Sequence, residues 1–373
     1  MSWRHLFSRS LAADPERLHF AAHSHHLWPD ASYDGHVAAW QDAAALADHK
    51  WDKVMGSLWS EAQQHVADEL KLPDPATLCF APNTHDFIVR LLSAIPARPV
   101  RVLASDGEFH SFRRQMTRWV EAGEVILETA SPDGLLARAR TDFFDLIFAS
   151  HVLFNSGEII SDLDSLAAMA RPEGPWVVID GYHGFMALET DLSPIAEQVF
   201  YLAGGYKYAM AGEGACFLHA PPGYAERPVV TGWYAAFDDL VLSSGDVGYA
   251  SDGRRFLGST FDPSGLYRFN AVQNMLNHEG LTTAVISNHV ADLQMQFLES
   301  GPLGDFELIN PLGDRQHARF LAFRGESAAA LHDSLAGQNV VVDVRGDVLR
   351  IGFGLYHDRE DVERLTEIIG HRV

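Results

Sequence analysis

The sequence predicts an α/β protein with a large, mostly parallel sheet, followed by a smaller C-terminal α+β domain. Short apolar runs alternate with helical patterns, and the runs end in polar loops around residues 83, 109, 150, 180 and 207. Because a parallel sheet is covered by helices on both faces, this alternation is typical of a doubly wound fold. In such folds the functional site lies at the carboxyl ends of the strands, where these polar loops are expected.

Composition and charge narrow the class of protein. The chain has 373 residues, 47% of them hydrophobic and 21% charged, which suffices for a large core and a smaller domain. A formal net charge of −22 argues against nucleic acid or an anionic membrane as a partner. Cys79 and Cys216 lie in apolar runs, as expected for buried thiols in a reducing cytoplasm. We expect a cytoplasmic location, because no signal-peptide core or membrane-length apolar run is present.

Residues 1–30 are expected to form an irregular arm with a short strand near residues 18–22. The arm contains the sequence His23-Ser-His-His26. Its spacing matches no standard zinc pattern, so we predict no metal site. An arm that supplies polar groups to a ligand pocket is the preferred interpretation, with Ser24 and His25 as candidate substrate contacts.

Two βα units follow the helical region of residues 31–71. A strand at residues 78–82 leads through Asn83 and Thr84 into a helix at residues 87–95. The free N–H groups and dipole of a helix N-terminus favour a phosphate, although a plain N-cap is an equally compatible interpretation. After the next strand, residues 100–105, an aromatic side chain could lie flat over a cofactor ring, and Phe109 and His110 are the candidates.

The following strands end in residues suited to cofactor chemistry. A strand at residues 145–151 presents Ser150 and precedes a helix at residues 159–169, and the strand at residues 176–180 ends in Asp180. An ionised carboxylate keeps a pyridine nitrogen protonated, which is the requirement of pyridoxal phosphate (PLP). The alternative is that Asp180 simply caps a helix.

Lys207 lies between two glycine-rich turns, after an apolar run at residues 199–203. A lysine at a strand end is desolvated, which lowers its pKa and frees the amine for imine chemistry. An ordinary surface lysine in a loop is the alternative. The lysine and the upstream Asp180 together form a two-part signal for PLP.

The C-terminal part alternates helices and strands. Helices are expected at residues 266–277, 281–298 and 358–369, and strands at residues 318–323, 340–344 and 348–356. We therefore predict a large domain at residues 31–258 and a small α+β domain at residues 259–373. Arg350 lies in an otherwise apolar strand, where it binds either a substrate carboxylate or an internal acidic partner.

These stretches resemble the class V, fold-type-I PLP-dependent enzymes, and within that group kynureninase. Gly205-Tyr-Lys-Tyr-Ala-Met-Ala-Gly-Glu-Gly-Ala215 resembles the segment around the family's cofactor-bearing lysine, and Asp180-Gly-Tyr-His183 resembles its Asp-x-x-His. Gly232-Trp233 resembles a Gly-Trp whose indole reaches the cofactor phosphate. Leu349-Arg-Ile-Gly-Phe-Gly-Leu-Tyr356 resembles the stretch in which an arginine precedes Leu-Tyr. The resemblance covers nearly the whole chain.

The resemblance implies PLP as cofactor, a homodimer with shared active sites, and a role for each matched residue. Lys207, Tyr206 and Asp180 would be catalytic, and Arg350 would hold the carboxylate of an amino-acid substrate. Cofactor contacts would come from Asn83, Thr84, Phe109, Ser150, Asp180, His183, Tyr206 and Lys207, and from Trp233, Ser259 and Thr260 of the neighbouring subunit. The implied reaction is hydrolysis of the Cβ–Cγ bond of kynurenine or a related β-acyl alanine.

Two departures from the kynureninase pattern leave the substrate open. Glu108-Phe-His-Ser-Phe112 ends in Phe112 where the family has an aspartate, and His23-Ser-His-His26 replaces Asn-Ser-Leu-Gly. A class V aminotransferase is the alternative function. A cysteine desulfurase or selenocysteine lyase is disfavoured because no cysteine follows Cys216, and a non-enzymatic relative would be expected to lack Lys207 or Asp180.

Overall fold

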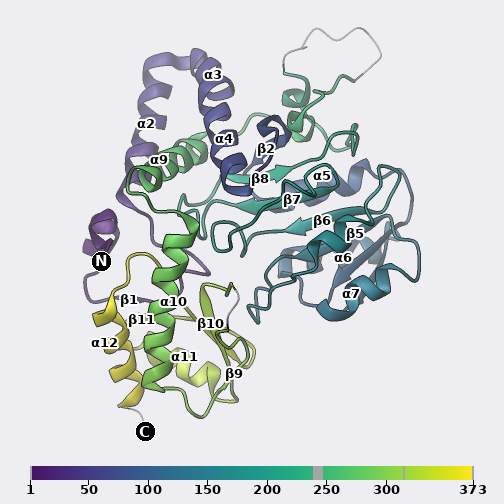
Figure 1. The fold of residues 1–373 in the computed structure, drawn as a ribbon. Helices are drawn as coiled ribbons and strands as arrows, with labels where there is room; N and C mark the ends of the chain where they lie inside the picture. Colours follow the sequence, from purple (N-terminus) through teal and green to yellow (C-terminus); the bar gives the residue numbers. More distant parts are fainter. Residues whose placement is uncertain (1, 238–246, 314–315, 372–373) are drawn as a thin grey trace.

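The computed structural model describes residues 2–237, 247–313 and 316–371 (Figure 1). A large sheet with its helices forms one part of the molecule, a smaller C-terminal sheet forms the other, and the helix α10 (Thr283–Ser300) runs from one to the other. Across these ranges none of the helices combines the length and the hydrophobicity that crossing a bilayer requires.

The large sheet has seven strands and is mostly parallel, as predicted. In spatial order they are β2 (Leu78–Ala81), β8 (Cys216–His219), β7 (Val199–Gly204), β6 (Trp176–Asp180), β5 (Leu146–Ser150), β3 (Val100–Ser105) and β4 (Val125–Ala130). Only β8 runs against its neighbours in this sheet. Because β5, β6 and β7 are parallel and in register, Ser150 pairs with Asp180 and Asp180 with Leu202, so the polar strand ends meet at one edge.

Helices cover this sheet, and further helices lie beyond one end of it. The helices of the larger part are α2 (Asp30–Leu46), α3 (Lys50–Lys53), α4 (Trp59–Leu70), α5 (Thr84–Ala94), α6 (His110–Glu121), α7 (Pro132–Ala139), α8 (Leu163–Ala167) and α9 (Ser264–His278). The predicted helical region between residues 31 and 71 is therefore several helices, since Ala47 takes a φ of 50° that ends α2. Packing of α2 against α9 joins sequence-distant segments (Figure 1).

The smaller sheet is antiparallel. Its strands, in spatial order, are β12 (Asp343–Arg345), β13 (Val348–Gly352), β10 (Phe320–Arg324) and β9 (Glu307–Leu308), and its helices besides α10 are α11 (Ala328–Ala336) and α12 (Arg359–Gly370). Helices α10 and α12 pack together (Figure 1). A separate apolar cluster lies beneath this sheet, so this part has a core of its own.

The N-terminal arm connects the two cores. It contains a short helix, α1 (Ser8–Ala12), and a two-residue strand, β1 (Leu18–His19), that pairs in parallel with β11 (Val340–Val341). Phe7 is buried in the core of the larger part, whereas Phe20 is buried in the core of the smaller part. The arm is thus ordered by contacts with both parts.

Packing suggests a different domain boundary from the predicted one at residues 258 and 259. Leu266 and Phe269 of α9 lie in the core of the larger part, as does Ile286 near the start of α10. Val290, one helical turn further along α10, lies in the core of the smaller part. We therefore propose that the boundary falls within α10, because one continuous helix contributes to both cores.

Several elements differ from the predicted ones in their bounds. The helix predicted at residues 159–169 shrinks to α8 because Ile159 forms an antiparallel bridge with Val152. The strand predicted at residues 340–344 splits, since β11 pairs with β1 and β12 pairs with β13. Strand β4 and helices α7 and α11 lie in stretches for which the sequence analysis predicted no element.

Buried histidines predict loss of stability in acid. His219, at the end of β8, lies 2.8 Å from Thr77 Oγ1 and from the Ala196 carbonyl oxygen, and burial lowers its pKa to about 4. An unfolded chain takes up this proton near pH 6.5, so the free energy of unfolding should fall as the pH drops from about 6.5 towards 4. One such histidine contributes on the order of 1–3 kcal/mol.

Urea unfolding at pH 6.5 and 4.5 measures this effect. His219→Gln should show a smaller acid-induced loss than the native chain, and His49→Gln, at a side chain 88% exposed, should show the native loss. Equal losses for His219→Gln and the native chain would contradict the assignment.

Candidate active site

A cavity of about 260 Å³ opens at the carboxyl edge of the large sheet. Lys207 and Asp180 both line it. Its other walls come from the loops after β2, β3, β5, β6 and β7 and are formed by Asn83, Thr84, His85, Phe109, Ser111, Ser150, Val152, Phe154, Tyr182, His183 and Tyr206. The structure therefore brings together eight of the predicted cofactor contacts, which come from loops scattered along the chain.

Lys207 is buried rather than solvated, so the surface-lysine alternative is wrong. Its side chain is 7% exposed, and the amine donates a hydrogen bond of 2.7 Å to the main-chain oxygen of His23. Burial, reinforced by the charge of Arg350, lowers the pKa of Lys207 to about 7. A large fraction of the amine is therefore unprotonated near neutral pH, which is the state in which it acts as a nucleophile or a base.

The turn that presents Lys207 requires glycine. A Cβ on Gly204 would lie 2.1 Å from the Tyr182 hydroxyl and 2.8 Å from Cys216 Sγ. Gly204 ends β7, so this close packing fixes where the chain leaves the sheet. Lys207 follows three residues later and is directed back into the cavity.

Asp180 occupies the end of the neighbouring strand β6. It is 8% exposed, and its Oδ1 accepts the main-chain N–H of Tyr182 at 2.9 Å. Burial raises the pKa of Asp180 to about 6, while the Tyr182 N–H and the charge of Lys207 oppose this rise. A cation placed beside this carboxylate would favour its ionised form, because the carboxylate has little water around it.

The start of α5 offers an anion seat at another wall of the cavity. Asn83 is the N-cap and accepts the N–H of Asp86 at 3.0 Å, so the plain N-cap interpretation is confirmed. Asn83 and Thr84 also line the cavity, and the helix they begin has eleven residues. Their position is compatible with an anion at the helix N-terminus.

Aromatic side chains shape the remaining walls. Tyr206 stacks against His25, with ring centroids 5.0 Å apart, and packs beside Tyr182. His183 is buried, which lowers its pKa well below the ordinary value, and Phe109 lines the mouth at 38% exposure. These positions keep Phe109, His183 and Tyr206 available to a ring-shaped ligand.

Glu108 is a buried acid that the sequence analysis did not identify as a site residue. Its carboxylate accepts the hydroxyl of Ser105 at 2.5 Å and both the N–H and the hydroxyl of Ser150, at 2.9 and 2.6 Å. Burial raises the pKa of Glu108 to about 7, and the charge of Asp180 adds to the rise. Ser150 is thus held at the cavity wall by Glu108. An acid in the short loop after the apolar strand β3 was the available signal.

Arg350 already has an acidic partner. It lies on β13, is 2% exposed, and donates to a carboxylate oxygen of Asp343 and to the main-chain oxygen of Phe154. Arg345 lies 2.9 Å from the other oxygen of Asp343. The internal partner considered for Arg350 is therefore present, and a substrate carboxylate would have to compete with Asp343 for the guanidinium group.

The predicted substrate contacts of the arm lie outside the lining of the cavity. The side chain of His25 is 67% exposed, and the main-chain N–H of Ser24 bonds to the Ala21 oxygen. The arm's direct contribution to the site is instead the carbonyl group of His23. A main-chain contact of this kind leaves no mark in the residue pattern. The substrate role of Ser24 and His25 stays a prediction.

The residues predicted to act from a neighbouring subunit lie away from the cavity of their own chain. Trp233 is 45% exposed and packs beside Tyr234 and Phe237 in a short 3-10 helix. Ser259 and Thr260 are exposed as well. Their surface position leaves them free to contact a second chain, and their cofactor role stays a prediction.

Two comparisons with known proteins match parts of this chain. Residues 286–369 match the kynureninase C-terminal domain family. Over 207 residues the chain is 30% identical to isopenicillin N epimerase of Streptomyces clavuligerus, a match that covers 51% of this chain and 50% of that protein, so it spans about half the length of the curated relative.

Solved structures match over the whole chain. The apo cysteine desulfurase from Thermococcus onnurineus NA1 has a TM-score of 0.80 at 18% identity, covering 100% of this chain and 99% of that one. A variant of the cystine lyase C-DES, with glycine covalently linked to its PLP cofactor, has a TM-score of 0.79 at 16% identity, covering 99% of each chain. The chain has the fold of the class V, fold-type-I PLP-dependent enzymes, which confirms the predicted resemblance and fold class.

Replacing Lys207 should stabilise the cofactor-free protein. A buried amine with a pKa near 7 in the fold and near 10.5 when unfolded weakens the fold most below pH 7, and this penalty disappears as the pH rises towards 10.5. Lys207→Met should therefore raise the free energy of unfolding, by an amount that is roughly 3 kcal/mol larger at pH 6 than at pH 9.

Urea unfolding of the cofactor-free proteins at both pH values is the measurement. Lys71→Met, at a side chain 64% exposed, is the matched control and should show no such pH-dependent gain. A Lys207→Met gain that is the same at pH 6 and pH 9 would show that the amine is not desolvated.

Removing the partner of Arg350 should weaken the fold. Asp343→Asn would leave a buried guanidinium group without its carboxylate, at a cost of roughly 3 kcal/mol. Thermal or urea unfolding measures the loss, and Asp347→Asn, at a side chain 63% exposed, is the control with little expected effect. Native stability in Asp343→Asn would argue that the buried pair does not form.

Proposed function

We propose that the chain is a PLP-dependent enzyme acting on an amino acid, and that its reaction is the kynureninase-type hydrolysis of a β-acyl alanine. The observation that carries the proposal is the meeting of a buried amine and a buried carboxylate in one cavity, Lys207 with a pKa of about 7 and Asp180 with a pKa of about 6. A merely structural lysine would be expected to avoid such burial, because the charged form is penalised.

The residues of the cavity fit the chemical groups of PLP. Lys207 supplies the amine that the cofactor aldehyde requires, and Asp180 supplies a carboxylate for the ring nitrogen. Asn83 and Thr84 supply a helix N-terminus for the phosphate. The bound cofactor supplies an electron sink for charge that develops on the substrate.

The protein's own groups would then bind and orient the substrate and move its protons. Lys207 is the base that takes a proton from the α-carbon, because about half of its amine is neutral near pH 7. Arg350 would hold the substrate carboxylate after that carboxylate displaces Asp343, which keeps a second cation in Arg345. Tyr206 is the proton donor we propose, because its ring lies at the cavity wall beside Lys207.

Three other reactions of PLP-dependent enzymes are weighed against this hydrolysis by residues, relatives or products. The 30% identity to isopenicillin N epimerase favours, as a second candidate, removal and return of the α-proton without bond cleavage. Sulfur transfer through a cysteine of this chain is disfavoured, since Cys79 and Cys216 are buried and burial raises the pKa of each thiol to about 12. An aminotransferase would use the same cavity residues and is distinguished by its product.

We also propose that two copies of the chain complete each other's sites. Trp233, Ser259 and Thr260 would then contact the cofactor phosphate of the neighbouring subunit. Exposed apolar side chains close to Trp233 support this, since Val229 is 78% exposed and Val230 is 44% exposed. A second copy would remove these side chains from water.

Lys207→Ala should abolish the absorbance band of lysine-linked cofactor in the purified protein. The native protein, incubated with kynurenine or 3-hydroxykynurenine, should release alanine and the corresponding anthranilate, and the variant should lose this activity by at least about a thousandfold. Absorbance spectra and chromatography of the products measure both effects. Lys71→Ala is the control and should keep the native band and activity.

The outcomes separate the cofactor proposal from the reaction proposal. A band that survives Lys207→Ala would show that another amine carries the cofactor. A native band with no anthranilate, together with a changed configuration of an amino acid, would assign the epimerase reaction, and formation of a keto acid would assign the aminotransferase.

A further inference from the structure

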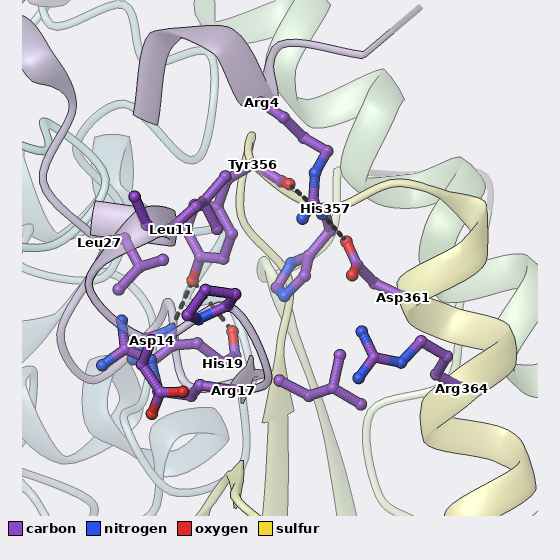
Figure 2. A pocket seen from close by; sticks show the side chains of 13 residues that line it. Arg4, Leu11, Asp14, Arg17, His19, Leu27, Tyr356, His357, Asp361 and Arg364 are labelled. Atoms are coloured by element: carbon purple, nitrogen blue, oxygen red, sulfur yellow. Dashed lines mark hydrogen bonds and ion pairs between the residues drawn. The ribbon is translucent and has the colours of Figure 1, made fainter. Parts of the chain in front are cut away.

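A second cavity lies between the N-terminal arm and the end of the chain, and it shares no lining residue with the candidate active site. Its volume is about 260 Å³ (Figure 2). The arm contributes apolar side chains, among them Leu11, Leu18 and Leu27, and the C-terminal segment contributes polar groups from Tyr356 to Arg364. The arm also contributes Arg4, Asp14, Arg17 and His19, so charged groups and an apolar wall of leucines face the same cavity.

His357 presents an unused donor to this cavity. The ring is 2% exposed and stacked on Phe20, and its Nδ1 accepts the main-chain N–H of Gly354 at 2.9 Å. Since Nδ1 accepts, the neutral ring carries its proton on Nε2. Nε2 is buried and makes no hydrogen bond of ordinary geometry among the described residues, and the main-chain oxygen of His19 is the acceptor that acts on this ring. Figure 2 shows this ring directed into the space between the arm and α12.

The charges around the cavity leave a cation in excess. Arg4, Arg17 and Arg364 line it, against Asp14 and Asp361. Asp361 is paired with Arg4 at 2.5 Å, which neutralises that cation. Asp14, the other acid, accepts two hydrogen bonds of 3.1 Å from the side-chain amide of Asn339. Among the described residues it forms no ion pair with an arginine.

Arg364 is the cation best placed for a ligand. Its ion pair with Glu16 is long, at 3.8 Å, and the Glu16 side chain is 86% exposed, so this contact is weak. The Arg364 guanidinium group and the His357 ring point into the same space (Figure 2). The His357 Nε2–H makes no hydrogen bond of ordinary geometry, and Arg364 is only weakly paired. A carboxylate group could accept from both.

We propose that this cavity is a second binding site, for a small carboxylate with a short apolar body. One carboxylate oxygen accepts the His357 Nε2–H and the other accepts from Arg364, while the hydrocarbon lies against the leucines of the arm. The ligand would hold the arm to the C-terminal helix α12. This inference does not depend on the reaction proposed for the active site.

Calorimetric titration of the purified full-length protein with sodium isovalerate tests the proposal. Isovalerate should bind with one site per chain, and isoamyl alcohol, which has the same carbon skeleton without the charge, should not. His357→Asn keeps an acceptor for the Gly354 N–H but removes the Nε2 donor, and Arg364→Gln removes the cation. Each variant should weaken binding by at least about fivefold.

The controls locate the site and the chemistry of its ligand. Arg359 lies on the same helix, α12, but outside the cavity lining. The Arg359→Gln variant should therefore bind isovalerate as the native chain does. Titration with L-leucine distinguishes the two sources of the carboxylate, since tighter binding of leucine would assign the site to a free amino acid. If His357→Asn fails to fold, the Arg364→Gln variant still tests the proposal, because the side chain of Arg364 is 46% exposed.

Two results would overturn the proposal. One is the absence of binding by both isovalerate and L-leucine. The other is binding that Arg364→Gln and His357→Asn leave unchanged, which would place the ligand elsewhere, such as at the buried Arg350.

Discussion

The hydrogen bond from the Lys207 amine to the His23 carbonyl is the contact on which the site depends. It joins residues 184 positions apart and satisfies an amine that is otherwise sealed from water. Without an acceptor, a buried amine would be too costly to retain in a cavity of this kind. Its presence explains why the arm must reach the end of β7, and why the arm itself is ordered by both cores.

The protonation of that amine is set by burial, which lowers its pKa, and by neighbouring charges of both signs. Arg350 lowers the pKa of Lys207, whereas Asp343 and Asp180 oppose that shift. Asp343 is shared by Arg350 and Arg345, so the small domain contributes charge to a cavity whose walls belong to the large sheet. The result is an amine close to its own midpoint of protonation near neutral pH, in a place where small shifts of a neighbouring charge alter its state.

Local sequence patterns predicted those site residues whose positions depend only on neighbouring residues in the chain. Glycines before Lys207 and an apolar run ending in Asp180 placed both residues at strand ends, and the parallel sheet brought those ends together. The His23 carbonyl could not be predicted, because any residue supplies a main-chain oxygen. Asp343 could not be predicted as the partner of Arg350, because antiparallel register decides which of several nearby acids faces the guanidinium group. The sequence also did not predict that α10 contributes to both cores, because a continuous helical pattern does not show which residues each turn packs against.

The pairing of β1 with β11 has a consequence for how the chain matures during synthesis. Residues 18 and 19 leave the ribosome early, but the residues they pair with, 340 and 341, come near the end of translation. Until then the arm has no partner strand to anchor it, and the nascent chain carries its reactive amine without the acceptor that seats it. Completion of this cavity is therefore a late step in folding, and a chain that stops short of β11 would leave the cavity unfinished even though every residue lining it has been made.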